Sequence, residues 1–269
     1  MKCRICKQEA VISLRSHNTA FCETCFLEFF SRQVARGIEK FQLITPEDRV
    51  LVAVSGGKDS QVVLDLCTRA IPSTDFEVIY SDTGYELPPS LKLYDEVQQY
   101  YKERFPSLRF HLARNHESVL NYWDKIGTPS DTHRWCCSVM KTAPLYRLLR
   151  KGERSNSKFL AFEGVRAEES QKRSDYSRIG KGVKHGFVIN ARPILKWNTV
   201  EVFLYLFGHE LQINEAYRFG KPRVGCILCP FGSPWDDMIV NKCYPDNLSP
   251  FIERIEKIAD ERKIPNRDE

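Results

Sequence analysis

A short run of glycine, serine, lysine and aspartate has the residue types that hold phosphate groups. Its members are Ser55, Gly56, Gly57, Lys58, Asp59 and Ser60. The two glycines let backbone N–H groups approach an anion closely, and the Lys58 ammonium adds a full positive charge. Asp59 would hold Mg²⁺ or orient Lys58, while the serine hydroxyls add donors. The alternative interpretation is a glycine turn that binds no ligand.

Four cysteines near the start of the chain form two CxxC pairs, which we call the first quartet. The pairs are Cys3 with Cys6 and Cys22 with Cys25, and 15 residues separate them. This spacing is typical of a tetrahedral zinc site, in which four thiolates leave no position open for catalysis. The first quartet therefore predicts a structural Zn²⁺, and the alternative is four reduced structural thiols.

Four later cysteines, the second quartet, have a different layout. They are Cys136, Cys137, Cys226 and Cys229, with 88 residues between the adjacent pair and the CxxC pair. Adjacent ligands suit a cuboidal cluster better sterically than they suit one tetrahedral ion. A zinc site and a set of catalytic or structural thiols remain open. Of the other two cysteines, Cys67 lies on an apolar helical face and Cys243 has no evident partner.

The elements that would position these residues alternate between strands and helices. Residues 49–54 are an apolar, β-rich run that leads into the glycine loop, and 61–69 favour a helix. Further strands are predicted near 76–80, 108–112 and 158–163, and further helices near 90–104 and 142–151. This alternation predicts an α/β fold with a doubly wound, mostly parallel sheet, whose ligands bind at the carboxyl ends of the strands.

Two other segments have recognisable patterns. Residues 28–45 show helical spacing of apolar side chains, and Arg32, Arg36 and Lys40 share another face of that helix. That basic face is interpreted as solvated surface or as a contact to a phosphate backbone. Residues 171–186 are rich in lysine, arginine, serine and glycine and are predicted to form a mobile loop.

Composition limits the class of protein. The chain has 269 residues, 42% of them hydrophobic, which is normal for a packed globular protein. No apolar run approaches the ~20 residues that span a bilayer, so we expect a cytoplasmic protein with no membrane partner. The net charge of +5 permits a nucleic-acid partner without demanding one. In a reducing compartment, ten cysteines favour metal or redox roles over disulfides.

The glycine loop resembles the SGGxDS pyrophosphate loop of the adenine-nucleotide alpha-hydrolase and ATP pyrophosphatase superfamily. It differs from the GxxxxGK[ST] loop of other nucleotide-binding proteins. The resemblance implies a HUP-like, PP-loop fold that binds ATP with Mg²⁺. Enzymes of this superfamily cleave ATP between its α- and β-phosphates, and they often adenylate a substrate oxygen.

Later stretches resemble the phosphoadenylylsulfate and adenylylsulfate reductase family. The matching stretches are residues 81–85, 134–141 with 144–145, 164–170, 192–197, 213–217 and 223–230. Over about residues 49–235, the resemblance implies that the second quartet carries a [4Fe–4S] cluster. Those reductases also have a catalytic cysteine in a C-terminal tail, whereas no cysteine follows Cys243 here.

The front of the chain resembles a different group of enzymes. Residues 1–65, which combine the first quartet with the glycine loop, are similar to the start of tRNA 2-thiolation enzymes. Those enzymes adenylate a base carbonyl oxygen and then install sulfur, often with a [4Fe–4S] cluster. Together the resemblances imply a zinc-binding module at 1–27, a linking helix at 28–48, a PP-loop ATP pyrophosphatase domain with an iron–sulfur site at 49–240, and a helical tail at 241–269.

The leading hypothesis is an ATP-dependent sulfurtransferase that adenylates a nucleic acid, with tRNA as the favoured acceptor. Lys58, Asp59, Cys136 and Cys226 would be its catalytic residues. Arg166 and Arg173 are candidate phosphate contacts, with a solvated loop as the alternative for Arg173, and Asp82 would bind ribose or metal or cap a turn. A cysteine desulfurase or a sulfur-carrier protein would donate sulfur. The sequence leaves open whether the chain forms a homodimer.

Three alternatives stay open at this point. One is DNA phosphorothioation, because proteins of that system also use a reductase-like ATP pyrophosphatase core. Another is a sulfonucleotide reductase with a different resolving thiol, which would release sulfite from adenylylsulfate. The third is a nucleotide-binding redox sensor, which would bind ATP tightly without turnover.

Overall fold

The chain divides into two compact units. The computed structural model describes residues 1–14, 17–45, 48–71, 75–150, 158–182 and 186–261. Unit 1 comprises residues 1–80, 95–111 and 154–213, and unit 2 comprises residues 81–94, 112–153 and 214–269. The predicted boundaries at residues 27, 48 and 240 remain predictions, and the end of the predicted tail, 262–269, lies outside the described residues.

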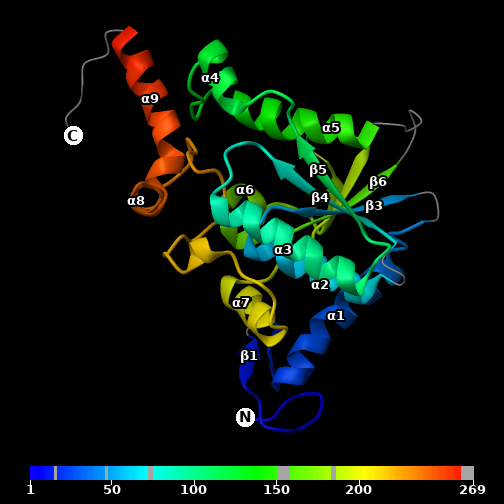
Figure 1. The fold of residues 1–269 in the computed structure, drawn as a ribbon. Coiled ribbons are helices and arrows are strands. Elements are labelled where there is room, and N and C mark those ends of the chain that lie inside the picture. The colour runs from blue at the N-terminus through cyan, green and yellow to red at the C-terminus, as the bar shows by residue number, and fades with distance from the viewer. Residues whose placement is uncertain (15–16, 46–47, 72–74, 151–157, 183–185, 262–269) are drawn as a thin grey trace. The chain divides into compact units, whose positions relative to one another are not determined.

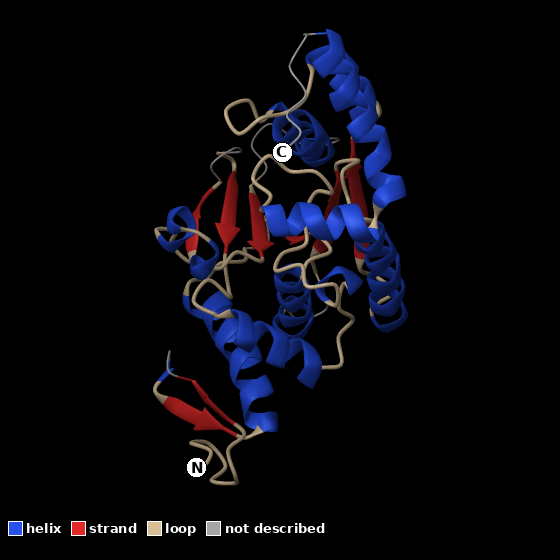
Figure 2. Cartoon of the chain, turned by 90° about the vertical axis from the view of Figure 1, so that its left-hand side faces the viewer, coloured by secondary structure: helices blue, strands red, loops and turns tan. Residues whose placement is uncertain are grey.

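The main sheet confirms the predicted α/β class. Within the described residues it has six strands in the order β5-β4-β3-β6-β8-β7 (Figures 1 and 2). Their bounds are β3 Arg49–Val54, β4 Glu77–Asp82, β5 Arg109–Arg114, β6 Phe159–Glu163, β7 Ile179–Lys181 and β8 Val188–Ala191. Strand β3 pairs in parallel with β4 and β6, β6 pairs in parallel with β8, and β7 runs antiparallel to β8. The sheet is therefore mostly parallel.

The strand order contains a reversal beside β3. The chain passes from β3 to β4 and β5 on one side, and then β6 pairs with the other side of β3. In doubly wound sheets, ligands bind outside the carboxyl ends of the strands at such a reversal. We therefore expect a ligand-binding site at the loops that follow β3 and β6.

Helix α2, Lys58–Ala70, buries an apolar face against β3 and β6. One carboxylate, Asp65, is also buried at the centre of this helix. The hydroxyl of Tyr205 donates to it at 2.7 Å, and the Arg69 guanidinium donates at 2.6 Å. Tyr205 belongs to α7, Thr199–Gly208, which packs on α2. The hydrogen bonds offset the cost of burying this charge, so they hold α2 and α7 together.

The first 40 residues form a small hairpin and a long helix in unit 1. Strands β1, Ile12–Leu14, and β2, Thr19–Phe21, pair antiparallel, and α1 spans Glu23–Lys40. The helix predicted at 28–45 thus begins five residues earlier and ends five earlier. Phe30 of α1 packs against Trp197, with ring centroids 4.0 Å apart. This contact ties the N-terminal module to the rest of unit 1.

Helices supply most of unit 2 and part of unit 1. The remaining helices are α3 Pro88–Arg104, α4 Val119–Ile126, α5 Ala143–Arg150, α6 Gln171–Ser174, α8 Pro234–Cys243 and α9 Pro245–Glu261. In unit 2, α9 packs on α4 and α8, and Phe251 stacks on Tyr85 with centroids 5.4 Å apart. The mobile loop predicted at 171–186 was wrong in part, because α6 and β7 lie within it, while 183–185 lie outside the described residues. Among the described helices, none has the length and apolarity to cross a bilayer.

Candidate nucleotide loop and metal centres

The glycine loop folds over one of its own serines. The backbone N–H of Ser55 donates to Ser60 Oγ at 3.1 Å, and that hydroxyl donates to the Gly57 carbonyl at 2.8 Å. Gly56 has a φ of +72°, a conformation that favours glycine. Helix α2 starts at Lys58 with Gly57 as its N-cap, so no side chain caps its first turn. Such a helix start favours anions, because its N–H groups and dipole point toward the loop.

A buried pair of cations meets one carboxylate at this loop. Lys58 is only 3% exposed, and its Nζ lies 3.3 Å from Asp59 Oδ2. Arg166, which follows β6 and is 2% exposed, donates from Nε to Asp59 Oδ1 at 2.5 Å. Burial disfavours the charged form of Arg166, but the Asp59 and Glu168 carboxylates outweigh it and raise its pKa. The structure thus brings Lys58, Asp59 and Arg166 together at the sheet reversal.

Gly164 lets the segment after β6 approach the loop this closely. A Cβ placed on Gly164 would lie 2.6 Å from the Asp59 carbonyl carbon and 2.7 Å from the Ser60 nitrogen. Contacts this short with backbone atoms do not occur, so any other residue would push the two segments apart. Residues 164–170 resemble the reductase family, but the sequence gives no signal for this packing contact of Gly164. Arg173 instead pairs with Glu169 within its own short segment.

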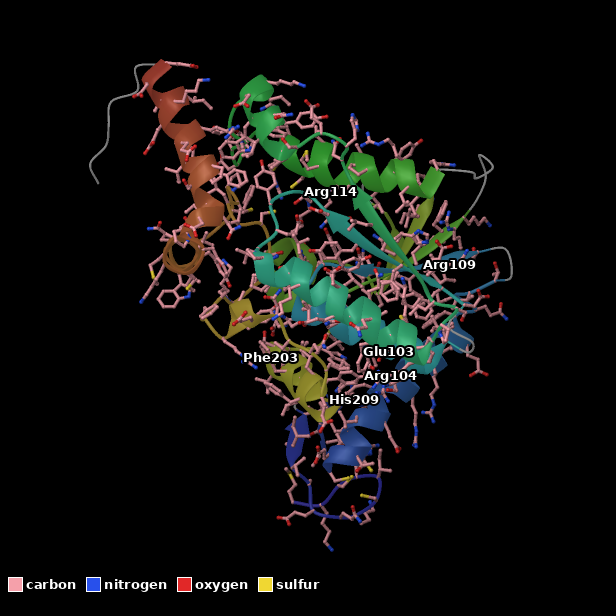
Figure 3. The ribbon with its side chains drawn as sticks, viewed as in Figure 1. Glu103, Arg104, Arg109, Arg114, Phe203 and His209 are labelled. Atoms are coloured by element: carbon pink, nitrogen blue, oxygen red, sulfur yellow. The ribbon has the colours of Figure 1, made fainter. Side chains whose placement is uncertain are left out.

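Asp82 lies at the end of β4, in unit 2. Its Oδ1 accepts the Gly84 N–H at 2.9 Å, and its Oδ2 lies 3.1 Å from Arg114 Nε. Arg114 is at the end of β5 (Figure 3). Burial and the Asp82 carboxylate raise the pKa of the nearby Glu86 to about 7, against hydrogen bonds from Thr83 that lower it. Asp82 therefore caps a turn and pairs with an arginine, and its predicted role in binding ribose or metal stays a prediction.

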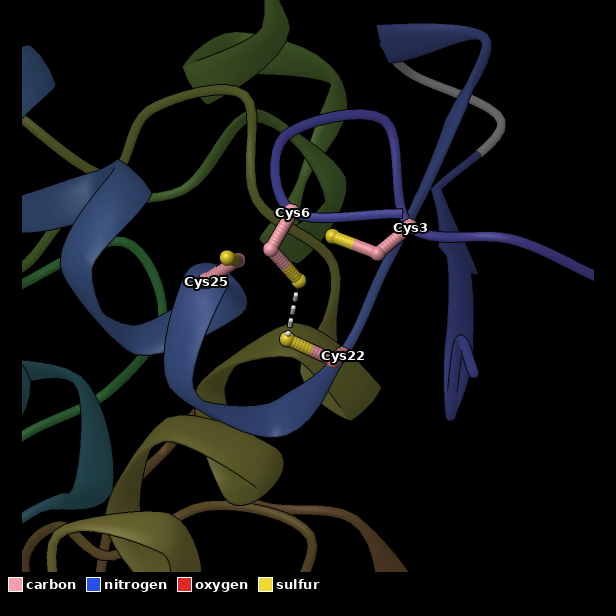
Figure 4. Close-up of side chains that lie close together, drawn as sticks. All are labelled: Cys3, Cys6, Cys22 and Cys25. Carbon is pink, nitrogen blue, oxygen red and sulfur yellow. Dashed lines mark hydrogen bonds between the residues drawn. The ribbon is translucent and has the colours of Figure 1, made fainter. Parts of the chain in front are cut away.

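The first quartet is gathered for one metal ion. All four Sγ atoms lie within 4.8 Å of one another, and those of Cys6 and Cys22 are 3.5 Å apart (Figure 4). Four sulfurs at 2.3 Å from a tetrahedral Zn²⁺ would be about 3.8 Å apart. The hairpin β1–β2 and the start of α1 position the ligands, because Cys22 is the N-cap of α1 and Cys25 lies in its first turn. The residues fit zinc.

The thiols of the first quartet differ in acidity. Burial raises the pKa of Cys25 to about 12, and the neighbouring thiols add to the effect. For Cys3, burial also acts to raise the pKa, but hydrogen bonds from the backbone of Cys6 and Cys22 lower it to about 6. Four crowded thiolates repel one another, so a divalent cation among them would be strongly favoured.

The second quartet lies in unit 2 on two unusual pieces of backbone. Cys137 begins a π-helix, Cys137–Thr142, with Cys136 as its N-cap. The other pair is fixed to the segment after β4, because Glu86 and Cys226 form a backbone bridge and the Ile227 N–H donates to Tyr85 O at 2.5 Å. A π-helical turn is rare and often marks a functional site. The sequence offered no signal for it.

The four thiols of the second quartet influence one another. The pKa of Cys226 is raised to about 12, mainly by burial and also by the carboxylate of Glu86 and the thiol of Cys229, while Lys141 acts to lower it. The hydrogen bond from Cys137 is the main cause of the raised pKa of Cys136. An apolar cluster that includes Trp123, Trp135 and Met140 packs behind these residues. The quartet is therefore one electrostatically connected group on an apolar wall.

The second quartet is more open than the first. Among the described residues, the first quartet is gathered closely enough to hold one metal ion, whereas the second quartet is not gathered in this way. A single tetrahedral ion requires about 3.8 Å between sulfurs, whereas a cluster with an iron at each corner holds its thiolates farther apart. The donor set and its spacing therefore fit a cluster better than zinc.

Comparison with known proteins assigns the family. A model of the phosphoadenosine phosphosulfate reductase domain matches residues 49–231. The chain belongs to this family. Residues 2–27 match a model of the N-terminal LIM domain of the 2-thiouridine synthetase TtuA. The predicted combination of a reductase-like core with a thiolation-enzyme-like front is confirmed.

Several individual relatives match this chain over about two thirds of its length or more. An uncharacterized protein of Methanocaldococcus jannaschii is 34% identical over 184 residues, which cover 67% of this chain and 36% of the relative. The chain thus spans only about a third to a half of the first two relatives that it matches. An adenosine 5'-phosphosulfate reductase of Bacillus anthracis is 29% identical over 71% of this chain and 80% of the relative.

A sequence relative and a solved structure, both of tRNA-thiolating enzymes, also match the chain. The tRNA-5-methyluridine(54) 2-sulfurtransferase of Pyrococcus horikoshii is 50% identical over 62 residues, 23% of this chain and 20% of the relative. The structure of the U34-tRNA thiolase NcsA from Methanococcus maripaludis with its [4Fe-4S] cluster matches with a TM-score of 0.59. That match has 17% identity and covers 100% of this chain and 90% of the other, so it supports the fold alone.

Proposed function

We propose that the chain is an ATP-dependent sulfurtransferase that adenylates a nucleic-acid acceptor, tRNA, and then inserts sulfur. The observation that carries the proposal is the loop at the sheet reversal, where Lys58 is buried beside Asp59 and Arg166. Two likenesses support the acceptor class: residues 2–27 match a 2-thiouridine synthetase domain, and 62 residues of the chain match a tRNA sulfurtransferase.

The loop residues would bind the triphosphate of ATP with Mg²⁺. A base carbonyl oxygen would attack the α-phosphorus, forming a new P–O bond while the bond to the β-phosphate breaks and pyrophosphate leaves. The Lys58 ammonium and the N-terminus of α2 would offset the charge that grows on the departing pyrophosphate. Asp59 would hold Lys58 and Arg166 in place, or exchange part of that contact for Mg²⁺.

In the second step, sulfide equivalents would displace AMP from the activated carbon. The donor class is a cysteine desulfurase or a sulfur-carrier protein. Cys136, Cys137, Cys226 and Cys229 would hold the [4Fe–4S] cluster, and because four thiolates occupy all four irons, the bound cluster would act structurally or electrostatically rather than by binding sulfide. The chain's own contribution has two parts. The apolar cluster behind the second quartet would exclude water, and the cations Arg134 and Lys141 would offset the negative charge of the bound cluster.

The test is turnover by the anaerobically purified full chain with ATP and bulk tRNA. Pyrophosphate and AMP are quantified, and thionucleosides are identified by mass spectrometry after digestion. Lys58→Ala should lower pyrophosphate release by about 100- to 1,000-fold, as removal of a charge-stabilising donor does elsewhere. Lys257→Ala, on the exposed face of α9, is the matched control. Absence of pyrophosphate with tRNA and with DNA would refute adenylation.

The relationship to adenosine 5'-phosphosulfate reductases favours a second candidate function. A reductase would release sulfite from adenylylsulfate with a thiol donor and would need no ATP. The same preparation therefore decides between the two, because sulfite without pyrophosphate supports reduction, and pyrophosphate without sulfite supports adenylation.

A further inference from the structure

Three large aromatic side chains of unit 2 are exposed in one stretch of the chain. Phe219, Phe231 and Trp235 are 44%, 57% and 54% exposed, and we call them the aromatic shelf. Large apolar side chains that gather on one exposed surface mark a binding site more often than single exposed ones do. The other three tryptophans, Trp123, Trp135 and Trp197, are all buried.

The structure fixes two of these exposed rings, Trp235 and Phe231, in place. The Trp235 indole N–H donates to the Gly220 carbonyl at 2.9 Å. Gly220 has a φ of +89°, and a Cβ there would lie 3.4 Å from Trp235 Cζ2, so the indole rests directly on this glycine. The guanidinium of Arg134 lies 4.3 Å from the centroid of Phe231. Both rings are therefore held before any ligand arrives, which lowers the entropy that binding would cost.

The charge around the shelf favours a polyanion. Exposed basic residues of the same unit flank it in sequence or contact it, namely Arg134, Arg218, Arg223 and Lys242. The acid nearest Trp235 in sequence, Asp236, is paired with the buried Lys221 at 2.7 Å. Glu215 and Asp237 are the exposed acids of this stretch. Aromatic faces with arginine planes beside them are the usual platform for unpaired RNA bases.

The shelf is also joined to the second quartet. Phe231 lies two residues after Cys229, whose carbonyl accepts the Gly232 N–H at 2.7 Å. Arg134, which covers Phe231, donates to the Sγ of Cys137 at 3.4 Å. A base held on Phe231 would therefore lie beside the thiols, within the same unit.

We propose that the aromatic shelf stacks an unpaired base of a single-stranded RNA segment next to the second quartet. The idea rests on the proposed function, because chemistry on a base carbonyl requires the base to leave its stack. The shelf supplies the surface that replaces the lost stacking, and Arg134 links that surface to Cys137.

The test measures binding of a labelled, short single-stranded oligouridylate by fluorescence anisotropy, with the anaerobically purified full chain. A matched abasic oligonucleotide keeps the phosphates and removes the bases. Trp235→Ala and Phe231→Ala should each weaken oligouridylate binding by about 5- to 150-fold, the range expected for one stacked base. Trp235→Phe keeps a ring and should retain most of the affinity. Phe207→Ala, which removes a 64% exposed aromatic of α7, should change nothing.

A second readout locates the contact. Photo-cross-linking with 5-iodouridine in the oligonucleotide should label the peptide that contains Phe231 or Trp235. Equal affinity of all variants, equal affinity for the abasic oligonucleotide, or cross-links confined to unit 1 would each overturn the proposal. If a protein partner occupies the shelf instead, the oligonucleotide will not distinguish the variants, and the proposal also fails.

Pyrophosphate release from ATP is measured on the same preparations, so the two ideas fail separately. Base-dependent binding without pyrophosphate would retain the shelf and reject adenylation. Pyrophosphate release with unchanged RNA affinity in both alanine variants would retain adenylation and reject the shelf.

Discussion

The two cysteine quartets differ in how the chain assembles them. The first comes from residues 3 to 25, and a hairpin and one helix start bring its sulfurs within 4.8 Å of one another. The second joins residues 136 and 137 to residues 226 and 229 through a π-helix and a backbone bridge. The difference teaches that a local, crowded quartet suits a structural ion, whereas a non-local, open quartet suits a group that takes part in chemistry.

Exchanging one ligand in each quartet gives the largest expected effect. Cys22→Ser should abolish zinc binding and leave iron content intact, and Cys226→Ser should do the reverse and remove the visible absorption of a cluster. The reason is that each site loses one of its four thiolates. Metal analysis of both anaerobically purified variants provides the measurement. Loss of both metals in either variant would show that the quartets are not independent.

Removing the Phe30 ring, which packs α1 and the first quartet onto Trp197, should have the next largest effect. Phe30→Ala deletes a ring that is 1% exposed and packs on Trp197, so it should cost about 3–5 kcal/mol of unfolding free energy. Phe41→Ala, at a ring 59% exposed, is the matched control and should cost little. Denaturant titration followed by circular dichroism measures both. Equal stability of the two variants would mean that the module does not contribute to the core of unit 1.

The acidity of the first quartet predicts how zinc uptake depends on pH. Cys25, with its pKa raised to about 12, carries a proton at neutral pH, while Cys3, with its pKa lowered to about 6, has mostly lost its own. Zinc must displace the remaining protons, so affinity should rise with pH by about tenfold per unit for each proton displaced. Competition with a chelator from pH 6 to pH 8 tests this. A flat profile would contradict the assignment of thiolate ligands.

The smallest effect is expected at Arg134, beside the second quartet. Its guanidinium donates to Cys137 Sγ, and removal of this charge by Arg134→Ala should shift the reduction potential of a bound cluster to more negative values. Arg147→Ala, on the exposed side of α5, is the control and should leave the potential unchanged. Redox titration followed by absorbance provides the reading. An unchanged reduction potential in Arg134→Ala would show that the charge of Arg134 does not act on a cluster held by the second quartet.

The parts that could be predicted from sequence are those set by local pattern. The strand at 49–54 agrees with β3 residue for residue, because an unbroken β-rich run next to a glycine turn has few other structures. The CxxC spacing likewise predicted a gathered first quartet. The site roles assigned to Lys58, Asp59 and the second quartet remain predictions, although the structure brings Lys58 and Asp59 together.

What could not be predicted depends on contacts between distant residues. Arg166 donates a hydrogen bond to Asp59, which lies 107 residues earlier in the chain. Gly164 must lack a side chain because the backbone of Asp59 and Ser60 occupies the space where its Cβ would lie. Neither fact has a signature in the neighbouring sequence. The sequence also gives no signal for the π-helix at Cys137–Thr142, because six residues are too few to show a repeating pattern of apolar side chains. The sequence does not predict the start of α1 at Glu23, because a CxxC pair indicates a metal site and shows no helical period.

The placement of Phe30 on α1 has a mechanical consequence. Cys25 lies in the first turn of α1, and Phe30, five residues later, contacts Trp197. At 1.5 Å per residue, these two points are about 7.5 Å apart along the helix axis. A continuous helix, rather than a flexible linker, therefore joins the metal ligand Cys25 to the ring contact that holds α1 on the rest of unit 1, so the first quartet would turn with α1 as one rigid piece.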